Sequence, residues 1–282
     1  MDLSMLQDAQ RDLKVFQAAP QRFVSVENLT HDDSMSFARQ APAPGLLFVD
    51  GGNQLVLEMP SYSIHLLRVA SVKALPQQRL ISARREWLVM DRNGFVSVDG
   101  DSYECSIDEL RKRFEHDWAR AHVADMPSQS LIVLDGSLDR MPELPGLCVG
   151  LSKTTDIKDA EGRSVLDFLP DDCGLGCFKI GSIKGADVYM VRLHEQSHIW
   201  FRCDVEQAAG LDVRRVFGQL ATLANDPVFL GYPYPLIKAD ALARVTNEET
   251  QMRKARMLSA VPRLERLSRQ MDTHDILDTL RF

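Results

Sequence analysis

Two segments of the chain, Leu46–Gly51 and Leu131–Gly136, share one pattern in which four apolar residues precede Asp-Gly. Such an apolar run is typical of a strand buried on both faces, and each aspartate is expected where its strand ends. If the strands are neighbours, Asp50 and Asp135 converge, and they repel unless a cation lies between them. Hard divalent ions such as Mg²⁺ and Mn²⁺ take such ligands. The alternative is that each Asp-Gly is an ordinary turn.

A predicted helix lies between these two segments and carries further carboxylates. Ser106 and Glu109 form a capping-box pattern that begins a helix running to about residue 124. The apolar stripe of this helix consists of Ile107, Leu110, Phe114, Trp118 and Ala121. Glu115 lies at the edge of the stripe, where it can lean toward the sheet. Glu109 and Asp117 remain rivals for the same role, and the alternative for each is a solvated surface acid.

The C-terminal part of the chain holds one more acid and several residues that could contact nucleic acid. Asp240 lies just inside a helix that begins near Pro233, where a carboxylate suits the helix dipole. Tyr232 and Tyr234 could stack on splayed bases, or they could pack on the sheet as part of a rigid turn. Seven Arg/Lys stand against three acids between residues 244 and 269, in a predicted helix over about 248–271. Its members Arg253 and Arg256 could follow a phosphate backbone, or the helix could dock another protein.

Composition limits the class of protein. The chain has 282 residues, 45% of them hydrophobic and 26% charged, which supports a real core and excludes wholesale disorder. The formal net charge of −7, from 33 Lys+Arg and 40 Asp+Glu, excludes a protein that coats DNA with its whole surface. No stretch approaches the ~20 apolar residues that span a bilayer, and no signal-peptide pattern is present. Five scattered cysteines favour reduced thiols, so we expect a cytoplasmic protein without membrane contact.

Hydrophobic patterning predicts one α/β domain with a mixed sheet. A third buried strand over 147–151 ends at Ser152-Lys153, and 187–193 with 198–205 alternate like an antiparallel hairpin. Strands over 54–58 and 63–72 suggest a hairpin or meander, whereas 77–92 fits a helix or a strand. Further helices are predicted over 1–19, 206–224 and 235–247.

Two motifs are set aside. His194–His198 matches H-E-x-x-H, but zinc protease chemistry needs both histidines on one helix, and the flanking residues alternate like strands. Cys173 and Cys177 have C-x₃-C spacing without a second cysteine pair, which favours a loop. No P-loop pattern occurs, so any ATP-driven movement must come from a partner.

Four motifs follow one another as they do in NurA nucleases. They are Phe48–Gly52, Leu131–Leu138, Val149–Thr154 and Gly231–Asp240. The chain therefore resembles the NurA family over about residues 46–245. The resemblance implies an RNase H-like fold, in which a mixed β-sheet is flanked by helices. The nuclease domain would occupy 46–245, after an N-terminal helical segment over 1–45 and before a C-terminal helix and tail over 246–282.

The resemblance also implies an activity. NurA-like proteins are manganese-dependent deoxyribonucleases that hydrolyse phosphodiesters, with 5′→3′ exonuclease and single-strand endonuclease action. The implied cofactor is Mn²⁺, with Mg²⁺ as the alternative. The implied partners are DNA, a second copy in a homodimer, and a HerA-type hexameric ATPase in DNA end resection and repair. The competing hypothesis is a nuclease-like subunit that binds DNA or an ATPase without cutting.

Site residues carry over position by position. Asp50 and Asp135 match the two strand-end metal ligands, Glu115 matches the helix carboxylate, and Asp240 matches the last ligand before the final helix. Two ions held by these four would activate water and stabilise the leaving oxygen. Lys153 matches a basic position after the third strand that could contact the scissile phosphate, or it is a solvent-exposed lysine.

Overall fold

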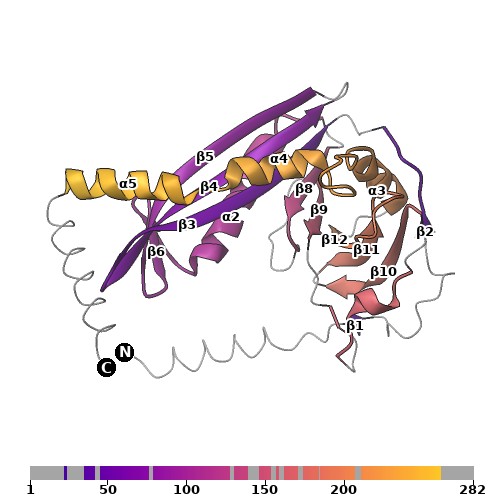
Figure 1. Ribbon diagram of the computed structural model, residues 1–282, viewed down its shortest axis with the longest axis horizontal. Helices are drawn as coiled ribbons and strands as arrows, with labels where there is room; N and C mark the ends of the chain where they lie inside the picture. Colours follow the sequence, from indigo (N-terminus) through magenta and orange to yellow (C-terminus); the bar gives the residue numbers. More distant parts are fainter. Residues whose placement is uncertain are drawn as a thin grey trace.

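The computed structural model describes residues 22–23, 35–41, 45–75, 79–127, 130–138, 146–153, 157–158, 162–170, 174–183, 185–206 and 211–261 (Figure 1). The helix predicted over residues 1–19 lies outside these residues, as does Cys173. No helix within the described part of the chain is long and apolar enough to cross a membrane.

One mixed sheet joins all the described strands, in the order β1-β10-β11-β12-β9-β8-β3-β4-β5-β6-β7, with β2 paired to β10. The strands are β1 (Arg22–Phe23), β2 (Met35–Ser36), β3 (Leu46–Met59), β4 (Tyr62–Leu75), β5 (Arg79–Arg92), β6 (Phe95–Val98), β7 (Asp101–Glu104), β8 (Leu131–Asp135), β9 (Leu147–Ser152), β10 (Gly176–Ile183), β11 (Ala186–Arg192) and β12 (Phe201–Glu206). Strands β3, β8 and β9 are parallel to one another, and the other pairs are antiparallel. The α/β architecture predicted from the sequence is confirmed.

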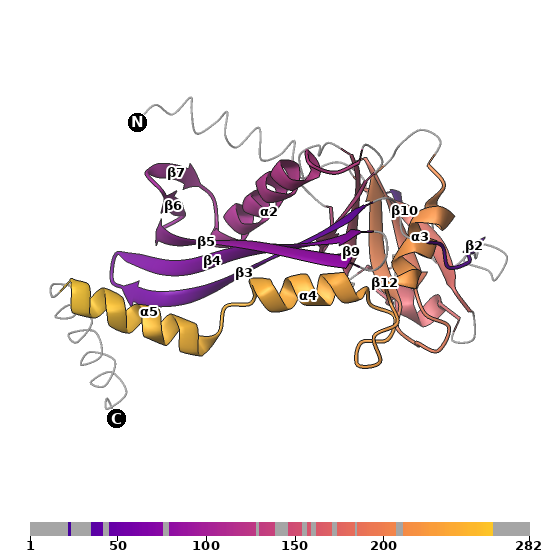
Figure 2. The same cartoon turned by 90° about the horizontal axis from the view of Figure 1, so that it is seen from above.

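Helices cover both faces of the sheet. Helix α2 (Ile107–Val123) and the 3₁₀ helix η4 (Val165–Phe168) lie on one face, while α3 (Val213–Thr222) and α4 (Tyr234–Ala243) lie on the other. Figure 2 shows α2 and α4 on opposite sides of β3 and β4. Leu46 and Phe48 of β3 join the core under α3 and α4, and Leu47 and Val49 join the core under α2. This alternation explains why β3 begins with four consecutive apolar residues.

Most predicted elements are present, with changed ends. The capping box at Ser106 begins α2, as expected, and the hairpin around Glu195 is β11 and β12. Within the ambiguous segment 77–92, residues Arg79–Arg92 form the strand β5, which pairs with β4 from Arg79 to Asp91. The helices predicted over 206–224, 235–247 and 248–271 correspond to α3, α4 and α5 (Asn247–Ala260).

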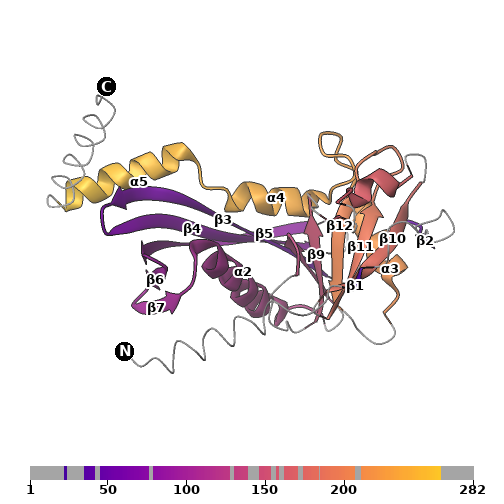
Figure 3. The ribbon, with the colours of Figure 1, turned by 90° about the horizontal axis from the view of Figure 1, so that it is seen from below.

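One expectation about β3 is wrong: the strand does not end at Asp50. It continues through Gly51 and Gly52 to Met59, paired with β4 along its length. Its parallel neighbour β8 does end, at Asp135. Asp50 therefore lies within a long strand at the point where the neighbouring strand stops. Beyond this point β3, β4 and β5 form an arm that carries α5 (Figure 3).

Candidate metal centre

Three aspartates from distant parts of the sequence converge beside the end of β8. Asp50 lies on β3, Asp135 is the last residue of β8, and Asp240 lies on α4. Each offers one carboxylate oxygen, and these three oxygens lie within 4.8 Å of one another. The parallel pairing of β3 with β8 brings the first two together, and α4 adds the third. The expected convergence of Asp50 and Asp135 is thus what the structure contains.

Two consecutive glycines allow the helices to approach this point from both faces. A Cβ at Gly52 would lie 2.5 Å from the carbonyl oxygen of Ala243, on α4. A Cβ at Gly51 would overlap the carboxylate of Glu115, on α2. Successive strand residues face opposite sides, so Gly52 shares the α4 face with Asp50. The Asp-Gly-Gly sequence therefore does not form a turn but seats α4 and α2 against β3.

We expect Gly52→Ala to destabilise the fold by about 1–3 kcal/mol, because the backbone of α4 must move away from β3. The same movement carries Asp240 away from Asp50 and would weaken the binding of a divalent cation by the three aspartates. Denaturant unfolding and Mn²⁺ titration measure the two effects. Gly174→Ala is the matched control, because a Cβ there meets nothing within 4 Å. Equal stability and Mn²⁺ affinity in the two variants would contradict this role of Gly52.

Three further side chains contact the aspartates. The ammonium of Lys153 donates to Asp135 at 2.9 Å and to Asp240 at 3.2 Å. The hydroxyl of Tyr232 donates to the other oxygen of Asp135 at 3.1 Å. Arg244 donates to Asp240 at 2.8 Å. Lys153 is half-exposed, so it neutralises two carboxylates while remaining open to solvent.

Burial and the repulsion between neighbouring carboxylates disfavour the charged form of Asp50. Burial raises the pKa of Asp50 to about 7, and the negative charges of Asp135 and Asp240 add to the rise. Burial alone would lower the pKa of Lys153, but its hydrogen bonds to the same two acids raise it above the usual value. Lys153 is therefore charged, yet its charge does not compensate Asp50 fully. A bound cation would relieve the remaining repulsion.

Glu115 lies on the opposite face of β3 from Asp50. Its side chain is buried, paired with Arg111 and placed against Gly51. Burial raises the pKa of Glu115 to about 8, against the opposing effect of Arg111, and the charges of Asp50 and Asp135 contribute to the rise. Among the described residues, the group within 4.8 Å contains the three aspartates and not Glu115. The expectation that Glu115 leans toward the sheet is correct.

The rival acids on α2 face solvent. Glu109 closes the capping box with Ser106, and Asp117 forms an exposed ion pair with Arg120.

The helix dipole does not explain the position of Asp240. From the sequence, this carboxylate is expected near the positive end of its helix, and that expectation is wrong. Asp240 lies in the second half of α4, away from the positive end of the helix dipole.

The donor set fits a hard divalent cation. It consists of carboxylate oxygens held on two strands and one helix, the ligand type that Mg²⁺ and Mn²⁺ use. It contains no histidine or thiolate, which zinc sites usually employ. Asp50, Asp135 and Asp240 are the residues that would hold the ion.

The fold itself has known counterparts. The chain is similar in structure to the NurA nuclease from Sulfolobus solfataricus, with a TM-score of 0.56 and 13% identity over 92% of this chain and 97% of that one. It has an RNase H-like fold. The catalytic domain of human Endonuclease V matches with a TM-score of 0.41 and 12% identity, over 86% of this chain and 96% of that one. A. aeolicus Argonaute matches with a TM-score of 0.42 and 10% identity, over 75% of this chain and 30% of that one.

The matches found are to solved structures. No family model matches the sequence, and no curated protein is similar to it in sequence. The resemblance to NurA nucleases inferred from four short motifs is thus supported by the fold.

The four residues expected to contact DNA differ in their exposure and in their partners. Tyr232 is 4% exposed, so the expectation that it stacks on bases is wrong; its ring packs on Phe201, and its hydroxyl holds Asp135. Tyr234 is half-exposed at the start of α4. Arg253 pairs with Glu86 on β5, and Arg256 is exposed on α5, over the arm of Figure 3.

The H-E-x-x-H motif does not form a metalloprotease site. His194 to His198 form a turn and loop after β11 instead of a helix, as expected. Glu195 pairs with Arg39 at 2.6 Å, which holds the pKa of Glu195 near 2.

Two arginines that contact the candidate acids, Arg111 and Arg244, were not predicted as site residues from the sequence. Arg111 lies four residues before Glu115, and Arg244 lies four residues after Asp240. Both follow the i,i+4 spacing that pairs opposite charges along a helix. This spacing, applied to each candidate acid, could have identified them.

Proposed function

We propose that the protein is a metal-dependent deoxyribonuclease that uses Mn²⁺, or Mg²⁺ in its place. The observation that carries this proposal is the convergence of Asp50, Asp135 and Asp240 oxygens within 4.8 Å. Its setting is a fold shared with a NurA nuclease. A carboxylate cluster beside a charged, half-exposed lysine suits a phosphodiester, because cations bind the anionic substrate while the acids hold the metal.

In this proposal each side chain has a separate task. Asp50, Asp135 and Asp240 hold the divalent ions, which when bound activate water and stabilise the leaving oxygen. Tyr232 fixes the orientation of Asp135 through its hydrogen bond. Lys153, which is bonded to two acids and half-exposed, donates to a phosphate oxygen of the substrate.

Glu115 is proposed as a fourth ligand. It is buried behind Gly51, and its pKa responds to the charges of Asp50 and Asp135. Arg111 holds its carboxylate and also donates to the carbonyl oxygen of Gly51 at 3.3 Å. Arg111 thus ties the acid to β3 from the α2 face.

We extend the proposal to partners on the strength of the NurA resemblance. The chain would act in DNA end processing and repair as a homodimer with a HerA-type hexameric ATPase, cutting 5′→3′ from ends and within single strands. The sequence has no P-loop pattern, so any ATP-driven movement of DNA would come from such a partner. A cytoplasmic location is proposed because the four described cysteines are free thiols, which suits a reducing compartment.

The direct test is degradation of linear DNA by the purified protein. We expect cleavage that requires Mn²⁺ or Mg²⁺ and that stops when EDTA is added. Undiminished activity in EDTA would contradict the metal mechanism. DNA binding without cleavage under any divalent ion would instead favour the non-cleaving subunit.

A further inference from the structure

Arg244 follows the last turn of α4 and lies beside the three aspartates. Its guanidinium donates to Oδ2 of Asp240 at 2.8 Å, while the ammonium of Lys153 donates to Oδ1 of the same residue at 3.2 Å. A Cβ at Gly52, which shares the α4 face of β3 with Asp50, would lie 3.6 Å from the Cα of Arg244. The side chain and the backbone therefore both place Arg244 at the metal centre.

A buried arginine fixes the backbone of Arg244. Arg68 on β4 is 3% exposed, and its guanidinium donates to the carbonyl oxygen of Arg244 at 2.7 Å. Glu86 on β5 and Glu249 on α5 accept from the second terminal nitrogen of Arg68, each at 2.9 Å. The N–H of Arg244 donates to the carbonyl oxygen of Asp240 at 2.9 Å. The backbone is thus preorganised, so a ligand of Arg244 has only the side chain to order.

The side chain of Arg244 has more binding capacity than Asp240 uses. It is 69% exposed, and a guanidinium carries five N–H donors in a planar fork. Asp240 also pairs with Lys153, so its one negative charge is divided between two cations. The anions that match the guanidinium fork with two oxygens are carboxylates and phosphates. Of these two, a phosphate is the group that the proposed function brings to this site.

The alternative is that Arg244 serves only the helix. A cation at the C-terminal end of a helix is stabilising, and the i,i+4 pair with Asp240 adds to this effect. The two roles predict opposite effects on metal binding. If Arg244 only holds α4 and Asp240 in place, its loss weakens metal binding. If Arg244 competes for a carboxylate that the metal needs, its loss strengthens metal binding.

We infer that Arg244 is a phosphate-binding residue that changes partner. When Asp240 binds a divalent cation, the ion takes up its charge, and the guanidinium of Arg244 turns to a phosphate oxygen of the DNA strand at the metal centre. Metal and DNA then bind cooperatively, because the ion releases the residue that the DNA uses. The inference rests on the proposed nuclease function and adds a second cationic contact, beside Lys153, to the substrate of that site.

Mn²⁺ binding to the full-length protein without DNA is the first test. Arg244→Gln removes the charge but keeps a side chain that can donate to Asp240. We expect this variant to bind Mn²⁺ about three- to tenfold more tightly than the wild type in isothermal titration calorimetry, because a competing cation is gone. Equal or weaker Mn²⁺ binding would assign Arg244 to the helix alone and overturn the inference.

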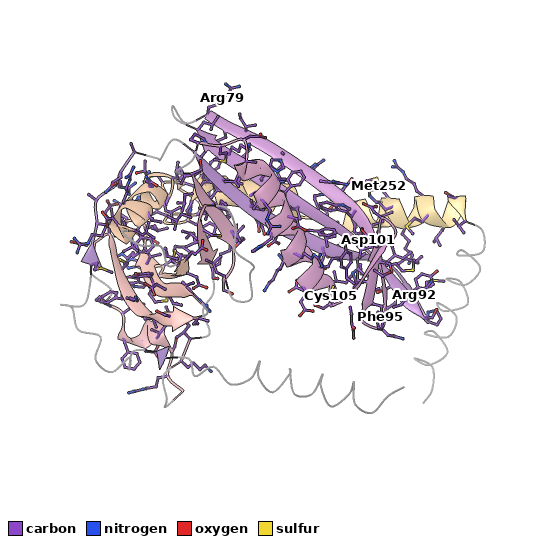
Figure 4. The ribbon with its side chains drawn as sticks, turned by 180° about the vertical axis from the view of Figure 1, so that it is seen from behind. Arg79, Arg92, Phe95, Asp101, Cys105 and Met252 are labelled. Carbon is purple, nitrogen blue, oxygen red and sulfur yellow. The ribbon has the colours of Figure 1, made fainter. Side chains whose placement is uncertain are left out.

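Arg92→Gln is the matched control, because it removes the same charge far from the metal centre. Arg92 is exposed at the end of β5 in the arm (Figure 4). Its neighbour Asp91 pairs with Ser63 of β4. Asp50 pairs with Ala70, seven residues further along β4, which corresponds to about 23 Å. Arg92→Gln should therefore bind Mn²⁺ as the wild type does.

DNA binding is the second test, followed by fluorescence anisotropy with a labelled oligonucleotide, in EDTA and with saturating Ca²⁺ in place of Mn²⁺. With Ca²⁺, Arg244→Gln should bind about tenfold more weakly than the wild type, and its salt dependence should fall by about one phosphate contact. In EDTA the two proteins should bind alike, since Arg244 then stays paired with Asp240. Arg244→Lys should recover part of the loss, and Arg92→Gln should show no dependence on Ca²⁺. A loss of equal size in both conditions, or no loss with Ca²⁺, would overturn the inference.

These measurements separate the inference from the proposed function. If the Ca²⁺-dependent loss is present but the wild type never cleaves DNA with Mn²⁺, the nuclease function fails and the contact of Arg244 with phosphate stands. If the wild type cleaves and the loss is absent, the inference fails alone. If the wild type binds no DNA in either condition, both fail.

Discussion

Asp135→Asn is expected to reduce Mn²⁺-dependent DNA cleavage by about 10³-fold, or roughly 4 kcal/mol of transition-state stabilisation. Asn has the same shape and can still accept the hydrogen bond from Tyr232, so the fold should persist. What is lost is the negative charge that Lys153 now pairs with and that a cation would require. Initial rates on linear DNA, with circular dichroism to confirm folding, measure the effect.

Asp117→Asn provides the matched control for Asp135→Asn. Asp117 is also an aspartate paired with a cation, but it is exposed on α2 and paired with Arg120. Its variant should cleave at the wild-type rate. Equal activity of Asp135→Asn and Asp117→Asn would remove Asp135 from the metal centre.

Asp204→Ala is expected to lower the free energy of unfolding by about 3–5 kcal/mol. Asp204 on β12 is 1% exposed and forms two hydrogen bonds with the guanidinium of Arg202, at 2.8 Å and 2.9 Å. It also accepts the N–H of Leu138 at 3.0 Å and thereby anchors the turn that follows Asp135. The variant removes a carboxylate that neutralises a buried cation. Denaturant unfolding measures the loss.

Two comparison variants define the origin of this loss. Asp117→Ala breaks an exposed ion pair and should change stability by less than about 1 kcal/mol. The double variant Arg202→Met with Asp204→Leu removes both buried charges together and should recover most of the stability. If Asp204→Ala were as stable as Asp117→Ala, the buried pair would not anchor this part of the sheet.

Three Asp-Gly pairs show what could be inferred from sequence. Asp99–Gly100 is a turn between β6 and β7, with positive φ at both residues. Asp50–Gly51 lies inside a strand, and Asp135–Gly136 ends one. The four apolar residues before the last two identify buried strands and thus separate them from the turn. The same context could not reveal that β3 continues, because glycine usually weakens a strand and its role here depends on α2 and α4.

The remaining errors concern contacts between distant elements. Helical periodicity placed Glu115 at the edge of the apolar stripe but left Glu109 and Asp117 as rivals. In the structure Glu115 is buried and the other two acids are exposed. No local pattern could decide whether Tyr232 faces solvent, since that depends on its packing against Phe201. The segment 77–92 was ambiguous for a similar reason: the strand within it, β5, is defined by pairing with β4.

The most direct test of the metal centre is a crystal structure with Mn²⁺, in which anomalous scattering locates the ion. We predict a peak bound by Asp50, Asp135 and Asp240, with the ammonium of Lys153 displaced from at least one of its two acids. The same crystals of Asp135→Asn should show a much weaker peak. An empty centre at millimolar Mn²⁺, with Lys153 still bridging Asp135 and Asp240 as it does now, would contradict a metal site at these aspartates.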